Sequence, residues 1–148
     1  MNTTTLRTSF ASAVIAFVLG IGGVIYCWAE GQKFSDSDVC RAAIGAIMGR
    51  DPTTIKITQV KDGIYYLTYT RPSDGTKWSQ RCKIEGNQVI WASDEPGKTG
   101  RWRTHPADEK ISFEAVQNGS VLRIRQQFPD GSSTSKDFTR NCSTPRGR

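Results

Sequence analysis

A succession of seven short runs rich in β-branched and aromatic residues occupies the chain from residue 55 onward. Most of the breaks between the runs hold turn residues such as Asp62-Gly63 and Asn118-Gly119, pairs that adopt the positive φ angles of tight hairpins. Tight hairpins join neighbouring antiparallel strands. The pattern therefore predicts an antiparallel β-meander of about six to seven strands, with strands at 55–60, 64–70, 76–84, 88–93, 110–116, 120–128 and 132–139.

One segment ahead of these runs has helical periodicity instead. Its apolar residues recur at a spacing that places them on one face of a helix. Ser35 or Asp36 can cap the start of this helix, and Asp51-Pro52 is expected to end it. The sequence thus predicts an α+β domain in which one short helix packs on the meander through an apolar stripe made of Cys40, Ala43, Ile44 and Ile47.

The N-terminal part carries no charged residue between Arg7 and Glu30. The apolar stretch from Phe10 to Ala29 has the length of roughly 20 residues that a membrane helix needs. A signal peptide cleaved after Ala29 is the alternative, but signal peptides have shorter apolar regions of about 7 to 15 residues. We therefore expect residues 1–31 to be a membrane anchor or signal peptide, followed by an exported domain at 34–140 and a polar tail at 141–148.

Both interpretations place the domain outside the cytoplasm. With an uncleaved segment, the chain is a single-pass membrane protein whose C-terminal domain lies on the far side of the membrane from Arg7. With cleavage, the domain is secreted or periplasmic. The 148 residues leave room for one such domain, and their net charge of +6 suits an anionic partner. Nucleic acid is not expected as that partner, because export separates the domain from it.

An exported domain can keep disulfides, so its cysteines are read as candidates for a bridge. Cys27 belongs to the apolar segment and Cys142 to the polar tail. Cys40 lies on the apolar face of the predicted helix, and strand alternation turns Cys82 to the same side as Trp78 and Ile84. The sequence predicts a disulfide between Cys40 and Cys82 that ties the helix to the sheet, with Cys142 free or paired between chains.

Strand alternation also predicts a basic face. Lys77, Arg81 and Lys83 lie opposite Cys82 on their strand, and Arg123 and Arg125 alternate with Leu122 and Ile124. If these strands share one sheet, the five cations face an anionic partner such as a lipid surface, a cell-wall polymer or an acidic protein. The alternative is a solvated face that only keeps the domain soluble.

The segment from Ser93 to Glu109 is longer than ordinary connections, and long loops are often functional. It places Arg101, Trp102, Arg103 and His105 close together, a set able to stack on a sugar or hold a carboxylate or phosphate. Trp102 has a second interpretation as a plug under the sheet edge, with Arg101 and Arg103 paired to nearby carboxylates: Asp94, Glu95, Asp108 or Glu109.

No arrangement in the sequence indicates catalysis. The sequence has one histidine, His105, and no serine in a Gly-x-Ser-x-Gly motif that it could activate. The cysteine spacings do not match a zinc site. We expect no enzyme, no catalytic residues, no metal and no cofactor. Two hypotheses remain: a membrane-anchored or secreted envelope-type module that binds anionic partners, and a small exported inhibitor or interaction module acting on another protein.

Overall fold

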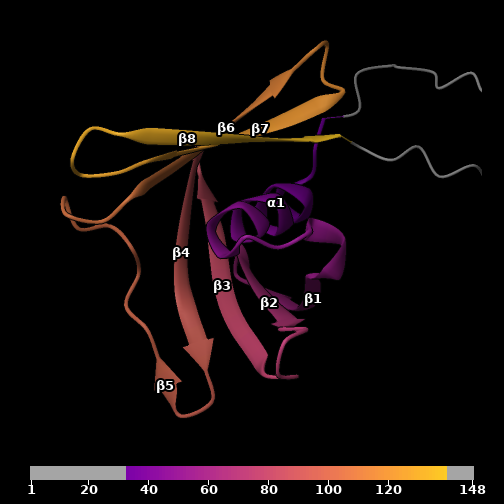
Figure 1. Cartoon of the computed structure of the whole chain (residues 1–148), viewed down its shortest axis with the longest axis vertical. Coiled ribbons are helices and arrows are strands. Elements are labelled where there is room, and N and C mark those ends of the chain that lie inside the picture. Colours follow the sequence, from indigo (N-terminus) through magenta and orange to yellow (C-terminus); the bar gives the residue numbers. More distant parts are fainter. Residues whose placement is uncertain (1–32, 140–148) are drawn as a thin grey trace, which may run out of the picture.

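The computed structural model describes residues 33–139, which form one helix and one antiparallel sheet (Figure 1). This agrees with the predicted α+β class. The sheet has eight strands because a two-residue strand, β5, adds to the seven expected from the sequence. The elements in chain order are α1 (Asp36–Met48), a 3-10 turn η1 (Pro52–Thr54), β1 (Lys56–Lys61), β2 (Ile64–Thr70), β3 (Lys77–Glu85), β4 (Gln88–Glu95), β5 (Lys98–Thr99), β6 (Lys110–Val116), β7 (Val121–Gln127) and β8 (Ser133–Thr139).

The strands follow one another across the sheet in the order β1-β2-β3-β4-β6-β7-β8, and β5 pairs with the far end of β4. In Figure 1, β3 and β4 run along the vertical of the view while β6–β8 cross its top, and α1 lies in the angle between these two parts of the sheet. The bend falls where β4 meets β6, because these strands pair at only two positions, Gln88 with Ser112 and Val89 with Ile111.

Helix α1 has defined ends that the local sequence provides. Ser35 is the N-cap, and its hydroxyl accepts a hydrogen bond from the Asp38 backbone N–H while the Asp38 carboxylate accepts one from the Ser35 backbone. The helix ends at Gly49, whose left-handed φ of 64° suits glycine. The end therefore comes just before the predicted Asp51-Pro52, which instead starts the 3-10 turn.

The core forms between α1 and one face of the sheet, here called the inner face. Cys40, Ala43 and Ile44 of the predicted stripe are completely buried, and Ile47 is partly buried against the same cluster. Strands from both parts of the sheet contribute to this core, including Leu67 of β2 and Leu122 and Ile124 of β7. The helix thus holds the two parts of the bent sheet together.

The predicted disulfide is present between Cys40 and Cys82, across 42 residues of sequence. Both side chains have no exposed surface, so the bridge joins α1 to β3 in the middle of the core. No helix within residues 33–139 is long and apolar enough to cross a membrane. The predicted anchor from Phe10 to Ala29, together with Cys27 and Cys142, lies outside the described residues.

Replacing both Cys40 and Cys82 with alanine should lower the free energy of unfolding by about 2 to 4 kcal/mol, because the bridge restricts the unfolded chain. Urea unfolding of parent and variant measures this difference. A reductant should destabilise the parent and leave the double variant unchanged. Equal midpoints for the oxidised parent and the variant would contradict a stabilising role for the bridge.

Candidate functional site

All five predicted sheet cations lie on the face opposite α1, here called the outer face. Cys82 points to the core, so its neighbours Arg81 and Lys83 point outward. Paired residues on neighbouring strands lie on the same face, and the outer face can be followed in this way across the sheet. Lys83 pairs with Ile90, Gln88 with Ser112, and Ser112 with Arg125. The cations do not form one flat stripe, since the bend separates those on β3 from those on β7.

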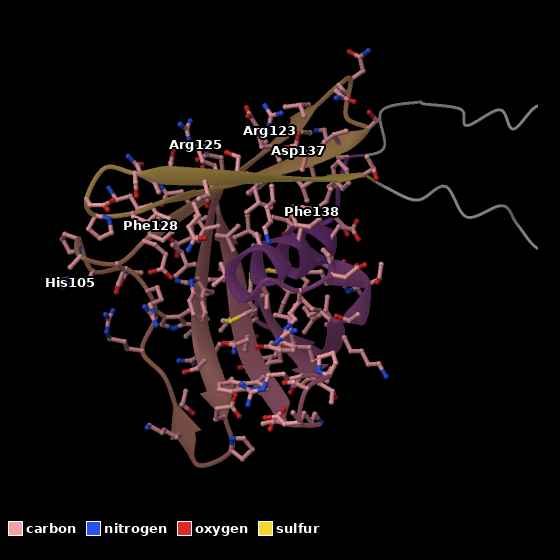
Figure 2. The ribbon with its side chains drawn as sticks, in the orientation of Figure 1. His105, Arg123, Arg125, Phe128, Asp137 and Phe138 are labelled. Atoms are coloured by element: carbon pink, nitrogen blue, oxygen red, sulfur yellow. A yellow bond between two sulfur atoms is a disulfide. The ribbon has the colours of Figure 1, made fainter. Side chains whose placement is uncertain are left out.

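Figure 2 shows the β7 part of this arrangement. Arg123, Arg125 and Asp137 extend away from α1, whereas Phe138 of β8 points toward it. Arg123 donates two hydrogen bonds of 2.8 Å to the Asp137 carboxylate, with Glu114 at 3.8 Å. The guanidinium holds the pKa of Asp137 below its usual value. Arg123 is thus largely committed within the sheet, whereas Arg125 forms no ion pair with any carboxylate of the described residues.

Sequence reasoning missed three further cations of the outer face, Lys110 of β6 and the two lysines of β1, Lys56 and Lys61. Five positions separate the β1 lysines, so regular alternation would put them on opposite faces. The register of β1 shifts between Ile57 and Gln59, and Lys56 then pairs with Thr68 while Lys61 pairs with Ile64. Such a bulge returns both lysines to the outer face. The residues of this segment contain no pattern that predicts the bulge.

Registers within the described sheet therefore assign more cations than carboxylates to the outer face. On the strands this face carries eight cations and four carboxylates. The excess of positive charge makes the outer face the candidate binding site for an anionic partner. The cations are Lys56, Lys61, Lys77, Arg81, Lys83, Lys110, Arg123 and Arg125, and the carboxylates are Glu85, Asp94, Glu114 and Asp137.

The segment between β5 and β6 follows the free edge of β4. The Gly100 N–H donates to the Ser93 carbonyl and the Arg103 N–H to the Trp91 carbonyl, both at 3.0 Å. A side chain at residue 100 would require Ser93 to shift, because a Cβ there would clash with the Ser93 hydroxyl oxygen and lie close to the Ser93 backbone. Edge pairing makes the loop behave like an irregular extra strand whose side chains reach both faces of the sheet.

Asp108 fixes the shape of this loop. Its carboxylate accepts hydrogen bonds of 2.6 and 2.7 Å from the Arg101 guanidinium and one of 2.9 Å from the His105 N–H. The Asp108 side chain is 6% exposed. The Arg101 guanidinium is the main cause that holds the pKa of Asp108 well below its usual range. Arg101 is therefore a structural partner of Asp108, as one of the two interpretations of this loop expected.

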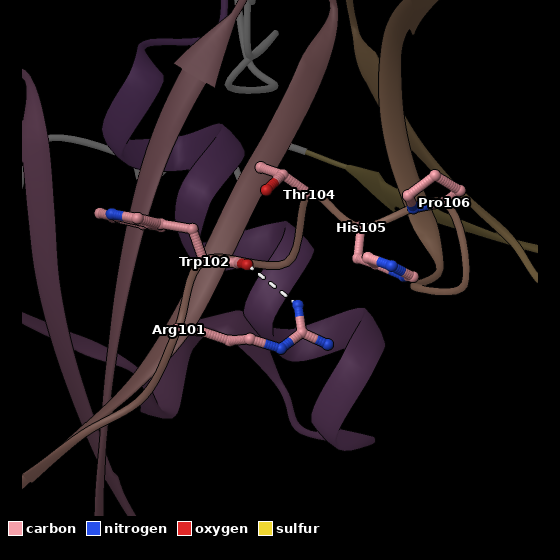
Figure 3. Close-up of a pocket in the computed structure, with 5 residues that line it drawn as sticks. All are labelled: Arg101, Trp102, Thr104, His105 and Pro106. Carbon is pink, nitrogen blue, oxygen red and sulfur yellow. Dashed lines mark hydrogen bonds between the residues drawn. The ribbon is translucent and has the colours of Figure 1, made fainter.

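Trp102 packs on the outer face over two of the predicted cations. The Arg81 guanidinium carbon lies 4.4 Å and the Lys83 ammonium 5.3 Å from the centre of a Trp102 ring. Arg81 also donates a 2.7 Å hydrogen bond to the Gly100 carbonyl. The indole stays half-buried beside an open hollow of about 710 Å³ lined by Arg101, Trp102, Thr104, His105 and Pro106 (Figure 3).

Arg103 contacts the other side of the β4 edge. Its guanidinium carbon lies 4.8 Å from the centre of a Trp91 ring, and its Nη1 lies 3.6 Å from a Glu109 oxygen. The Trp91 indole N–H donates to the same Glu109 carboxylate at 3.2 Å. The Arg103 Nη1 also lies 3.9 Å from an Asp108 oxygen, so Arg101 and Arg103 share this carboxylate, whereas Trp102 of the predicted cluster lies on the outer face.

Comparisons with known proteins leave the function to be argued from this geometry. No protein-family model matches the chain, and neither curated proteins nor solved structures match it. Within residues 33–139 no group of three or more histidine, cysteine, aspartate or glutamate side chains is arranged to hold a metal ion.

Replacing Asp108 with asparagine should loosen the loop and lower the melting temperature at pH 7. Because the folded state holds the pKa of Asp108 below its unfolded value of about 3.9, its contribution to stability is present above that value and is lost as the pH falls below it. The difference in melting temperature between parent and variant should therefore shrink from pH 7 to pH 3. A constant difference, with unchanged amide exchange at His105, would refute this role.

Replacing Trp102 with alanine tests whether the indole supports the fold. For this half-buried side chain we expect a loss of about 2 kcal/mol, below the 3 to 5 kcal/mol typical of fully buried aromatic residues, and a smaller loss for Trp102→Phe. Urea unfolding provides the measurement. An unchanged free energy of unfolding in Trp102→Ala would instead assign the indole to binding alone.

Proposed function

We propose that this chain is an exported, non-enzymatic binding module that holds an anionic polymer of the cell envelope on the outer face of its sheet. The excess of eight cations over four carboxylates on that face carries the proposal. Residues 10–29 anchor the module, and the domain faces away from the cytoplasm. If the anchor is cleaved after Ala29, the same domain acts as a secreted or periplasmic protein.

The distribution of the cations favours a polymer over a compact acidic protein or a flat lipid surface. They lie on β1, β3, β6 and β7, on both sides of the bend. A flat surface reaches one part of a bent sheet at a time, whereas a chain of repeated negative charges can follow the bend. The summed field of cations held on strands also raises the local concentration of such a partner.

The loop contributes the Trp102 indole to this face, beside Arg81 and Lys83. An aromatic ring that is backed by cations on one side suits a sugar polymer, because sugars stack on aromatic faces while their acidic groups meet the cations. Arg101 and Arg103 support the loop through Asp108 and Trp91. In this proposal they position Trp102 rather than contact the polymer.

The alternative function, an exported inhibitor of another protein, makes a different prediction about salt. Binding through exposed lysine and arginine side chains weakens steeply as ionic strength rises, because salt screens exposed charges over about 10 Å at 0.1 M. An inhibitor interface governed by shape depends much less on salt. Measuring how the affinity for the bound partner changes with salt concentration therefore separates the two functions.

A triple variant tests the outer face directly. Lys61→Gln, Lys77→Gln and Arg125→Gln remove three cations that form no ion pair with carboxylates of the described residues, so the fold should be kept. Each is worth at most about 1 kcal/mol near an anionic surface, and affinity for heparin, used as a soluble anionic polysaccharide, should fall by about 10- to 100-fold at low salt. Calorimetric titration of the full-length protein measures this fall.

The matched control removes the same number of positive charges elsewhere. Arg41 lies on α1, and Lys98 and Lys136 pair in register with inner-face positions of the sheet. Their triple change to glutamine should weaken heparin binding by no more than about twofold, since only the general field of the protein is reduced. Equal losses of heparin affinity in the two triple variants would reject a binding role for the outer face. Neutral dextran should bind neither the parent nor the variants.

A further inference from the structure

A small cleft opens where β4 changes neighbours. β6 covers the edge of β4 at Gln88 and Val89, and the loop covers it from Trp91 onward through the Arg103 N–H. Between these two coverings lies Ile90, which is 8% exposed. The resulting cavity has a volume of about 340 Å³, within the range of sites for small molecules.

The cleft has an apolar floor and a rim that carries both signs of charge. Ile90 is the outer-face residue of the floor and is 8% exposed, whereas Val89 and Ile111 line the cleft from inner-face positions and are each 2% exposed. Glu85 and Lys110 stand on the rim, together with the amide of Gln88 and the loop residues Arg103 to Pro106. Glu85, Gln88 and Lys110 are outer-face residues by register.

The walls of the cleft are firmly held. Asp108 fixes His105, and the His105 Nδ1 accepts a 3.2 Å hydrogen bond from the Ala107 N–H. A neutral His105 therefore carries its proton on Nε2, where it can be donated outside the loop. Glu109 and Arg103 are occupied by Trp91. Preformed walls lower the cost of ordering the site when a ligand binds.

Two exposed charged groups on the rim, Lys110 and Glu85, have opposite signs. Lys110 forms no ion pair with a carboxylate of the described residues, and it can meet a ligand carboxylate together with His105. The Glu85 carboxylate forms an ion pair with Lys83 and is still 56% exposed, so it can also meet a ligand ammonium group. The buried floor can accept an apolar side chain.

We propose that this cleft binds a short zwitterionic peptide, with its carboxylate at Lys110, its ammonium at Glu85 and an apolar side chain over Ile90. This proposal does not depend on polymer binding, because a small ligand with both charges is a different chemical class from a polyanion. The outer face would then hold two ligands, one on its cations and one in the cleft beside the loop.

Saturation-transfer NMR on the full-length protein in micelles tests the cleft, with the dipeptide alanyl-leucine as probe. We expect a dissociation constant in the millimolar range, as is usual for so small a ligand. N-acetylation and C-amidation of the dipeptide should each raise the dissociation constant at least about fivefold, because each removes one charge contact. Absence of saturation transfer to the free dipeptide would overturn the proposal.

Variants locate the binding within the molecule. Lys110→Gln should weaken binding of the free dipeptide about as much as amidation of the dipeptide does. It should not weaken binding of the amidated dipeptide further. Gln88→Trp should fill the cleft and abolish binding, and the sheet tolerates an aromatic residue at this exposed position. Lys98→Gln, the matched control on the β5 hairpin, should change nothing. Unchanged dipeptide binding in Gln88→Trp, with the disulfide and circular dichroism preserved, would place the ligand elsewhere.

Glu85→Gln separates this proposal from polymer binding. The change should weaken dipeptide binding because the ammonium partner is lost. It should leave heparin binding equal or slightly stronger, since a carboxylate is removed from the basic face. If heparin fails to bind the parent while the dipeptide results hold, the cleft stands and the polymer proposal falls. Loss of heparin binding together with dipeptide binding in this variant would contradict the cleft contact.

Discussion

Burial of α1 against the inner face of the sheet determines which surfaces of this domain are free to bind. Ile44 of the helix and Leu67 of β2 meet in a core that both parts of the bent sheet share. The Cys40–Cys82 bridge fixes the helix to β3 at the centre of that core. With the inner face covered, the cations of β1, β3 and β7 and the Trp102 indole remain on the outer face, which is why we place the binding function there.

The loop between β5 and β6 follows from the same bend. β6 leaves the edge of β4 after two residue pairs, and the exposed backbone of the remaining edge needs hydrogen-bond partners. The loop supplies them through Gly100 and Arg103, and the Arg101–Asp108 pair keeps its conformation. One structural requirement, the covering of an edge, thus produces both the position of Trp102 and the cleft at Ile90.

The parts of this fold with a strong local pattern could be predicted from the sequence. Helical spacing located α1, alternation oriented Cys82, and together they gave the disulfide. The bulge in β1 could not be predicted, because pairing with β2 rather than the residues 56–61 themselves determines it. Asp108 was one of several candidate partners for the loop arginines, since only the path of the chain along β4 brings it to Arg101. Local patterns therefore gave the elements and faces, and long-range pairing decided the site.

Lysine footprinting tests the central claim, that the outer face is the binding face, most directly. The full-length protein is acetylated with and without heparin, and the modification of each lysine is measured by mass spectrometry. The account predicts protection at Lys56, Lys61 and Lys77, which lie on the outer face, and no protection at Lys98 and Lys136, which lie away from it. Equal protection of both groups, or protection confined to Lys98 and Lys136, would contradict it.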